Sequence, residues 1–110
     1  MKPLTKEERK ICRRVLGAVR GYCCDQPEIK VMLVGSRATR TAHDRSDYDF
    51  VLDAGRPIAF EDYAALKVIC DNLPTLYGID LVDWHRASAD FKMLAGPERM
   101  EITPELVMGA

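Results

Sequence analysis

The feature that most constrains this chain is a polar segment that separates two strand-like patterns. The first pattern, Ile29–Val34, is short and rich in β-branched residues, and Gly35-Ser36 follows it directly. The second, Asp47–Asp53, alternates between polar and apolar residues and opens with Asp47-Tyr48-Asp49. This arrangement predicts two strands joined through a glycine-serine turn, with two carboxylates where the second strand begins.

Helical patterns lie on both sides of these strands. Thr5 and Glu8 form a capping box, which predicts a helix start just ahead of an apolar stripe of about four turns. A second stripe begins at Phe60, a third strand is predicted over 79–84, and Ser88 is placed to cap a further short helix.

The predicted order is therefore helix, strand, strand, helix, strand, helix. This order is typical of an α/β (α+β) fold in which helices flank one small sheet. The step from the second strand through a helix to the third predicts a parallel, right-handed connection. No prediction is made for the segment that follows Gly96.

Length and charge narrow the class of protein. The 110 residues predict a single domain over 1–110. Lys and Arg number 16 against 17 Asp and Glu, so the net charge of −1 argues against bulk nucleic-acid binding. The N-terminus lacks a leader-like apolar stretch and no membrane span is evident, so we expect a cytoplasmic protein. We expect its cysteines to be reduced, and these are Cys12, Cys23, Cys24 and Cys70.

The carboxylates of the second strand suggest a metal site. Asp47 and Asp49 are two residues apart, so both point to one face of the strand, where their charges repel. A divalent cation between them relieves that repulsion, and oxygen-only ligands suit Mg²⁺ or Mn²⁺. Asp80 joins this cluster if the third strand lies beside the second. Asp83 faces the other way, and we expect it at the surface or capping the strand end.

The turn after the first strand suggests a phosphate site. Gly35 lets the backbone approach a phosphate closely, and the Ser36 hydroxyl can donate a hydrogen bond to it. Arg37 and Arg40 are candidate phosphate contacts in the same loop. A phosphate cradle beside a carboxylate metal site is typical of phosphoryl or nucleotidyl transfer.

Gly35-Ser36, ten residues, and then Asp47-Tyr48-Asp49 resembles the signature of the nucleotidyltransferase superfamily related to DNA polymerase β. The stretch GSRATRTAHDRSDYDF and the short chain are similar to its smallest branch, the minimal nucleotidyltransferase (MNT) domains. The resemblance extends from about Val31 to Asp83. It implies the nucleotidyltransferase fold, two Mg²⁺ ions and ATP as substrate.

The resemblance also implies roles for individual residues. Gly35 and Ser36 would hold the triphosphate, Asp47 and Asp49 would bind the metals, and Asp80 would bind one metal and activate the acceptor hydroxyl. MNT domains are commonly paired with a HEPN-domain toxin. In that pairing the MNT protein is the antitoxin, and it can move AMP from ATP to a tyrosine of the toxin within a hetero-oligomer.

Two alternatives stay open from the sequence. Many relatives have Arg then Gly where this chain has Thr39 then Arg40, which favours an antitoxin that neutralises its toxin by binding alone. Nucleotidyl transfer to a small molecule such as an aminoglycoside is the other alternative. It is disfavoured because 110 residues leave little room for a substrate-binding domain.

Overall fold

The first helix begins where the capping box places it. In the computed structural model, which describes residues 3–22, 29–43, 45–95 and 99–108, the Thr5 N–H donates to Glu8 Oε1 at 2.9 Å. The Glu8 N–H donates to Thr5 Oγ1 at 3.1 Å. These reciprocal bonds satisfy two N–H groups at the start of helix α1 (Lys6–Tyr22). The predicted start of this helix is therefore confirmed.

The strands form one four-stranded mixed sheet. Its order is β3-β2-β1-β4, in which β1 pairs antiparallel with both β2 and β4, and β2 pairs parallel with β3. The predicted parallel step between the second and third strands is confirmed. The strands are β1 (Lys30–Val34), β2 (Tyr48–Asp53), β3 (Ile79–Asp83) and β4 (Met100–Glu101).

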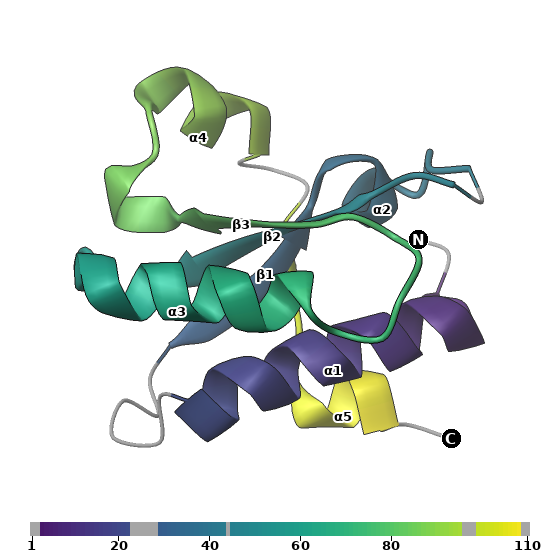
Figure 1. Ribbon diagram of the computed structural model, residues 1–110. Coiled ribbons are helices and arrows are strands. Elements are labelled where there is room, and N and C mark those ends of the chain that lie inside the picture. Colours follow the sequence, from purple (N-terminus) through teal and green to yellow (C-terminus); the bar gives the residue numbers. More distant parts are fainter. Residues whose placement is uncertain (1–2, 23–28, 44, 96–98, 109–110) are drawn as a thin grey trace.

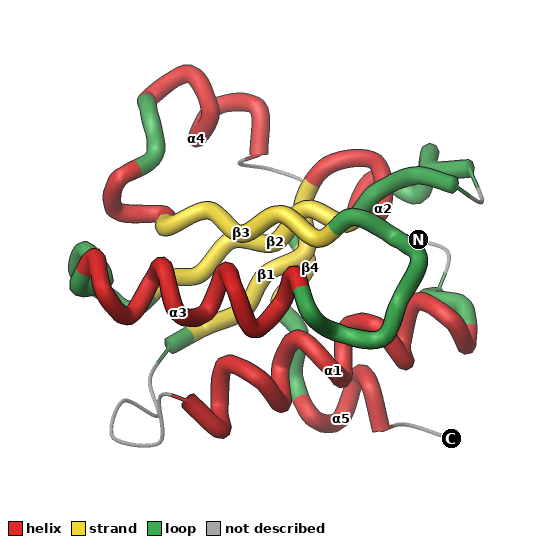
Figure 2. The backbone as a smooth tube through the Cα atoms, in the orientation of Figure 1, coloured by secondary structure: helices red, strands yellow, loops and turns green. Residues whose placement is uncertain are grey.

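Helices cover the two faces of the sheet unequally. Helices α1, α3 (Phe60–Asp71) and α5 (Pro104–Met108) lie on one side of the sheet, and α4 (Ala89–Ala95) lies on the other (Figures 1 and 2). The first side holds the larger core, in which Tyr48, Phe50 and Leu66 are fully buried. The α/β fold class predicted from the sequence is thus confirmed.

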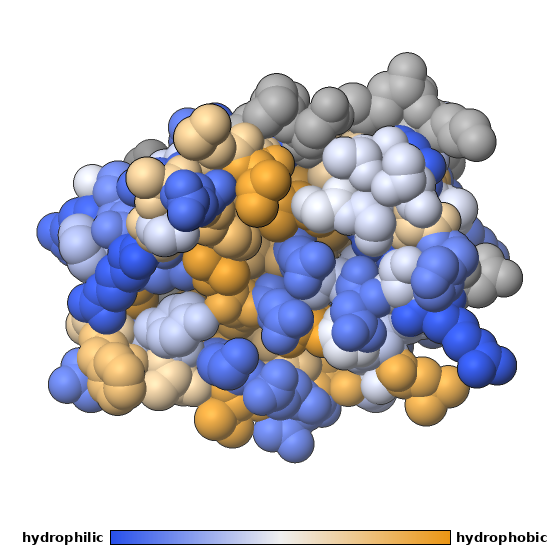
Figure 3. Space-filling view, turned by 90° about the horizontal axis from the view of Figure 1, so that it is seen from above, coloured by the Kyte–Doolittle hydropathy of each residue, from blue (hydrophilic) through white to orange (hydrophobic). Residues whose placement is uncertain are grey.

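The opposite face of the sheet is only partly covered. Its smaller core contains Met32, Val34, Val51 and Ala95, and Trp84 packs against it. Ser88 caps α4 by accepting a hydrogen bond from the Phe91 N–H at 3.1 Å, as the sequence predicts. Viewed from the side of α4, apolar surface lies among hydrophilic side chains (Figure 3). Partial cover leaves room on this face for polar groups.

Four elements go beyond the predicted order. Residues Gly35–Thr39 form the five-residue helix α2, and Trp84–Arg86 form the 3₁₀ helix η1. The last strand and last helix, β4 and α5, were not predicted. The two-residue strand β4 is too short to show a pattern, and it exists because Met32 and Leu33 of β1 pair with it. No helix in the described ranges is long and apolar enough to cross a membrane.

Two cysteines lie in the described residues, and both are free and buried. This agrees with the prediction of reduced thiols, while Cys23 and Cys24 lie outside the described residues. Burial, followed by the charge of Glu8, raises the pKa of the Cys12 thiol to about 12. The thiol therefore stays protonated and unreactive at neutral pH.

We expect Cys12 to resist alkylation as long as the protein is folded. Iodoacetamide at pH 8 should modify it at least about tenfold more slowly in the native protein than in urea, because only the exposed thiolate reacts. Peptide mass mapping measures the modification at each cysteine. Equal labelling rates in the two conditions would contradict the burial of α1 against the sheet.

Candidate active site

Asp49 and Asp80 lie side by side on the partly covered face of the sheet. They are directly paired in the parallel register of β2 and β3. Burial raises the pKa of Asp49, and the charges of Asp80 and Asp47, together with a hydrogen bond shared with Asp80, raise it further. The carboxylates thus repel one another, as expected of groups that share a site. The fold brings together residues 31 positions apart in the sequence.

Asp47 stands just before β2, since the strand begins at Tyr48 and not at Asp47 as predicted. Its Oδ1 accepts a hydrogen bond from the Gly78 N–H at 3.0 Å. A Cβ atom on Gly78 would lie 2.9 Å from Asp47 Cγ, so only glycine permits this approach. Asp47 is therefore fixed at the edge of the cluster by the segment that enters β3.

Gly35 forms the wall of the cluster on the side of β1. Its φ of +71° is a left-handed conformation that favours glycine. A Cβ atom at this position would lie 2.8 Å from Asp49 Oδ2. The glycine-serine turn therefore lies directly against the carboxylate of Asp49. The half-buried Ser36 comes next, in the first turn of α2.

The cluster fits a magnesium ion in its chemistry. Asp49 and Asp80 offer carboxylate oxygens at one place, and Mg²⁺ is usually held by one or two carboxylates plus substrate phosphates. Within the described residues, no group of three or more His, Cys, Asp or Glu side chains is arranged around one metal position. Asp47, the remaining predicted ligand, directs its carboxylate to the Gly78 N–H.

Arg37 and Arg40, the predicted phosphate contacts, have other partners in the structure. Both guanidinium groups bind the carboxylate of Glu8, which is only 3% exposed. Arg40 Nη2 lies 2.5 Å from Glu8 Oε1, and Arg37 Nη1 lies 3.1 Å from Glu8 Oε2. A direct contact with phosphate would require either side chain to leave Glu8. The sequence identified Glu8 only as a capping residue.

The charge of Glu8 is stabilised by these contacts. Burial alone would raise the pKa of its carboxyl group, but hydrogen bonds from Arg40, the Thr5 N–H and Arg37 lower it to about 2. A carboxylate with a lowered pKa stabilises the fold fully above its ordinary pKa of 4.5, and that contribution is lost as the pH falls towards 2. The ion network is therefore intact at neutral pH.

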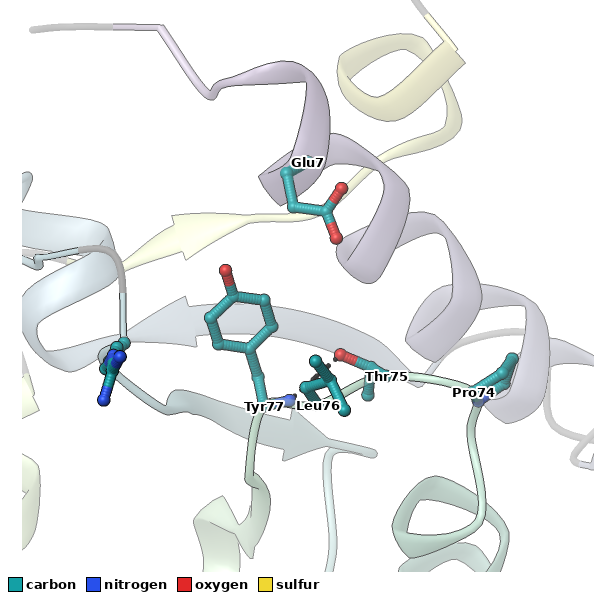
Figure 4. A pocket seen from close by; sticks show the side chains of 6 residues that line it. Glu7, Pro74, Thr75, Leu76 and Tyr77 are labelled. Atoms are coloured by element: carbon teal, nitrogen blue, oxygen red, sulfur yellow. Dashed lines mark hydrogen bonds between the residues drawn. The ribbon is translucent and has the colours of Figure 1, made fainter.

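Arg37 also packs between two tyrosine rings. Its guanidinium carbon lies 4.3 Å from the ring centre of Tyr48 and 5.3 Å from that of Tyr77. Tyr77 in turn faces a hollow of about 570 Å³ beside Glu7 of α1 (Figure 4). The residues that line this hollow include none of the predicted site residues. The carboxylate cluster lies outside it, on the open face of the sheet.

Asp83 and His85 belong to the other end of the sheet. Asp83 is buried, not at the surface, and it caps the strand end as predicted by accepting from the Ile58 and His85 N–H groups. His85 Nε2 lies 2.8 Å from Asp53 Oδ1. Both residues have structural partners, so neither is placed in the candidate site.

No protein-family model and no curated protein matches the chain. Among solved structures, a chain of the toxin–antitoxin pair MntA-HpeT, mutated from Asp to Glu at two places, has a TM-score of 0.64 at 18% identity. This match covers 82% of our chain and 70% of the other. A toxin–antitoxin structure with AMP-PNP gives a TM-score of 0.65 at 20% identity, with the same two coverages.

A third similar structure is the tri-AMPylated HEPN toxin of Shewanella oneidensis in complex with its MNT antitoxin. The matched chain shares 15% identity at a TM-score of 0.63, and the match covers 88% of our chain and 71% of that chain. Together these likenesses show that the chain has the nucleotidyltransferase-like fold of MNT antitoxins. The fold implied by the sequence resemblance is thereby confirmed.

Proposed function

We propose that this chain is a nucleotidyltransferase that moves AMP from ATP to a hydroxyl group, that of a tyrosine, on a HEPN toxin, and so acts as its antitoxin. The observation that carries the proposal is the pairing of Asp49 with Asp80 against Gly35, because it combines a carboxylate pair with a glycine turn suited to phosphate. Two of the similar structures support the proposal. One contains a HEPN toxin carrying AMP, and the other is a toxin–antitoxin structure with AMP-PNP.

The proposed roles combine the resemblance to MNT domains with the position of each residue. Asp47, Asp49 and Asp80 would hold two Mg²⁺ ions, and Gly35 and Ser36 would hold the triphosphate of ATP. Magnesium, when bound, would neutralise phosphate charge and stabilise the attacking and leaving oxygens. The open face beside α4 leaves the carboxylates accessible to a second protein, and Asp80 is exposed.

The proposed reaction is an in-line displacement at the α-phosphorus of ATP. The acceptor oxygen forms a bond to the α-phosphorus while the bond from that phosphorus to the bridging oxygen breaks, and pyrophosphate leaves with the electron pair. The hydroxyl proton passes to Asp80 as general base. The product is a toxin with AMP in a phosphodiester link to its hydroxyl oxygen.

A second candidate function is neutralisation by binding alone. One observation favours it. Asp47 binds the Gly78 N–H and both arginines bind Glu8, so fewer groups are free to bind a nucleotide. Transfer to a small molecule such as an aminoglycoside has no comparable support in the geometry. The two antitoxin functions differ in whether the partner changes mass.

A transfer assay separates these functions. The protein is mixed with a candidate HEPN-domain partner, ATP and Mg²⁺, and intact-mass spectrometry measures the mass added to the partner. We expect one or more AMP groups to be added, and Asp47→Asn to reduce the rate at least about 100-fold because a metal ligand is lost. Asp71→Asn, at an exposed position of α3, is the control. Neutralisation without any added mass would overturn the proposal in favour of binding alone.

A further inference from the structure

Arg40 has an unusual backbone conformation. It follows the last residue of α2 with φ +64° and ψ +30°, and among the described non-glycine residues it alone has a positive φ. Residues with a Cβ atom adopt this left-handed conformation at a cost in free energy, so surrounding contacts must maintain it. The contacts that do so run in two directions, to Ser36 and to Glu8.

The backbone around Arg40 folds back onto Ser36. The Arg40 N–H donates to the Ser36 carbonyl oxygen, as do the N–H groups of Thr41 at 2.9 Å and Ala42 at 3.1 Å. One carbonyl thus accepts from several successive amides. The position of Ser36, a residue proposed to bind the triphosphate, is therefore fixed by the turn at Arg40.

The side chain of Arg40 fastens this turn to α1. Its two terminal nitrogens form a fork on the carboxylate of Glu8, at 2.9 Å to Oε2 and 2.5 Å to Oε1. Nη1 also donates to the Arg37 carbonyl oxygen at 2.6 Å. Such a fork fixes both the distance and the plane of the guanidinium group. The start of α1 thereby determines where the turn after α2 lies.

Arg37 connects the same carboxylate to the start of β2. While Nη1 binds Glu8, Nη2 donates to the Ser46 carbonyl oxygen at 2.7 Å, one residue before Asp47. The guanidinium group also stacks on the ring of Tyr48, which lies between Asp47 and Asp49 in the chain. Glu8 therefore holds the loop of Ser36 and the segment of the aspartates through one carboxylate.

Stability alone does not account for this network. Buried ion pairs contribute little compared with well-packed apolar residues, because the charges lose their hydration. In the described residues, Arg37 Nε, Arg40 Nε and the Tyr48 hydroxyl are buried without hydrogen-bond partners, and Arg40 is strained. What the network supplies is a fixed geometry between two loops.

We propose that Glu8 is a positioning residue, which acts through Arg37 and Arg40 to hold the turn of Ser36 at a set distance from Asp47 and Asp49. The inference rests on the proposed function for the use of that geometry in nucleotide transfer. Neither arginine needs to touch the nucleotide. The two arginines instead determine where the triphosphate would lie relative to the carboxylates.

Glu8→Gln tests this role with little change in shape. Glutamine also serves in a capping box, so the start of α1 is kept while the charge that holds both arginines is lost. Glu7→Gln, at the exposed neighbouring position, is the matched control. Arg40→Gly is a second variant, which relieves the strained backbone and removes the fork on Glu8 together.

The first measurement is hydrogen exchange of the Thr41 and Ala42 amides, which needs no nucleotide. In Glu8→Gln we expect these amides to exchange about tenfold faster, with the amides of β1 unchanged, because the turn opens locally without global unfolding. Glu7→Gln should match the wild type. Unchanged exchange at both amides in Glu8→Gln would overturn the proposal, whatever the activity.

The second measurement is the kinetics of AMP transfer. We expect both Glu8→Gln and Arg40→Gly to raise KM for ATP about tenfold and to change kcat less, because the triphosphate subsite is displaced while the carboxylates remain. KM and kcat both within twofold of wild type would overturn the positioning role. A wild-type protein that transfers nothing would refute the proposed function, whereas the exchange data would still decide whether Glu8 holds the turn.

Discussion

Replacing Asp49 with asparagine should abolish nucleotide transfer and at the same time stabilise the protein without metal. The loss of transfer, at least about 100-fold, follows from removing a carboxylate that the proposed mechanism requires. The gain in stability follows from electrostatics. Burial and the charges of Asp80 and Asp47 raise the pKa of Asp49, so its ionised form destabilises the folded state at neutral pH.

The pH dependence of this gain has a defined sign. A carboxyl group whose pKa is raised by folding binds its proton more tightly in the folded state, so the stability of the wild type falls as the pH rises through that range. Asparagine does not ionise, so the variant does not lose stability in this way as the pH rises. Asp49→Asn should therefore melt higher than the wild type at pH 7, and the difference should vanish below the ordinary pKa of 3.8.

Thermal unfolding in EDTA and then in Mg²⁺ checks both parts. Without metal we expect Asp49→Asn to melt a few degrees above the wild type. Increases in melting temperature of about this size are common when a destabilising functional group is removed. Added Mg²⁺ should stabilise the wild type more than the variant, because the variant lacks one of the proposed carboxylate ligands. The exposed Asp71→Asn variant should show neither change. A lower melting temperature for Asp49→Asn in EDTA would contradict the repulsion described here.

Gly35→Ala should be the most damaging small substitution in the Gly35-Ser36 turn. The added Cβ would lie 2.8 Å from Asp49 Oδ2, so the carboxylate must move. The φ of +71° adds backbone strain of about 1–2 kcal/mol. We expect AMP transfer to fall about 100-fold, since displacing a catalytic group by about 1 Å has an effect of this size.

Gly55→Ala is the matched control for this variant. Gly55 has a φ of +77°, so alanine there suffers the same kind of strain, but no atom lies within 4 Å of its added Cβ. Chemical denaturation should show a loss of stability for both variants, because both carry the backbone strain. Transfer assays should show a loss of activity only for Gly35→Ala. If both variants kept full activity, the contact between Gly35 and Asp49 would have no part in the reaction.

Local patterns in the sequence were sufficient to predict the start of α1, the central residues of the strands and the cap of α4. Thr5 with Glu8 and Ser88 with Phe91 are contacts between residues three apart, so they need only the local backbone. The alternation around Phe50 places Tyr48, Phe50 and Leu52 together on the face that packs in the larger core. The grouping of Asp47 with Asp49 follows from the same alternation, which is why the sequence could indicate a carboxylate site.

Other features depend on contacts between residues distant in sequence. Asp83 was expected at the surface or as a cap, and the packing of the segment around Ile58 buries it. The second role of Glu8 arises because α1 packs near the turn at Arg40, 32 residues away. A local sequence pattern does not show which charged side chains will contact a buried carboxylate. The sequence therefore predicts phosphate, and not Glu8, as the partner of the two arginines.

The sequence by itself determined the types of chemical group at the candidate site, because glycine, serine and aspartate at their spacing predict a phosphate turn and a carboxylate pair. Only the tertiary structure decided their geometry. The parallel pairing of β2 with β3 places Asp80 beside Asp49, and the fork of Arg40 on Glu8 fixes the turn of Ser36. Strand pairing and buried ion pairs join segments tens of residues apart, so their outcome depends on how the whole chain packs.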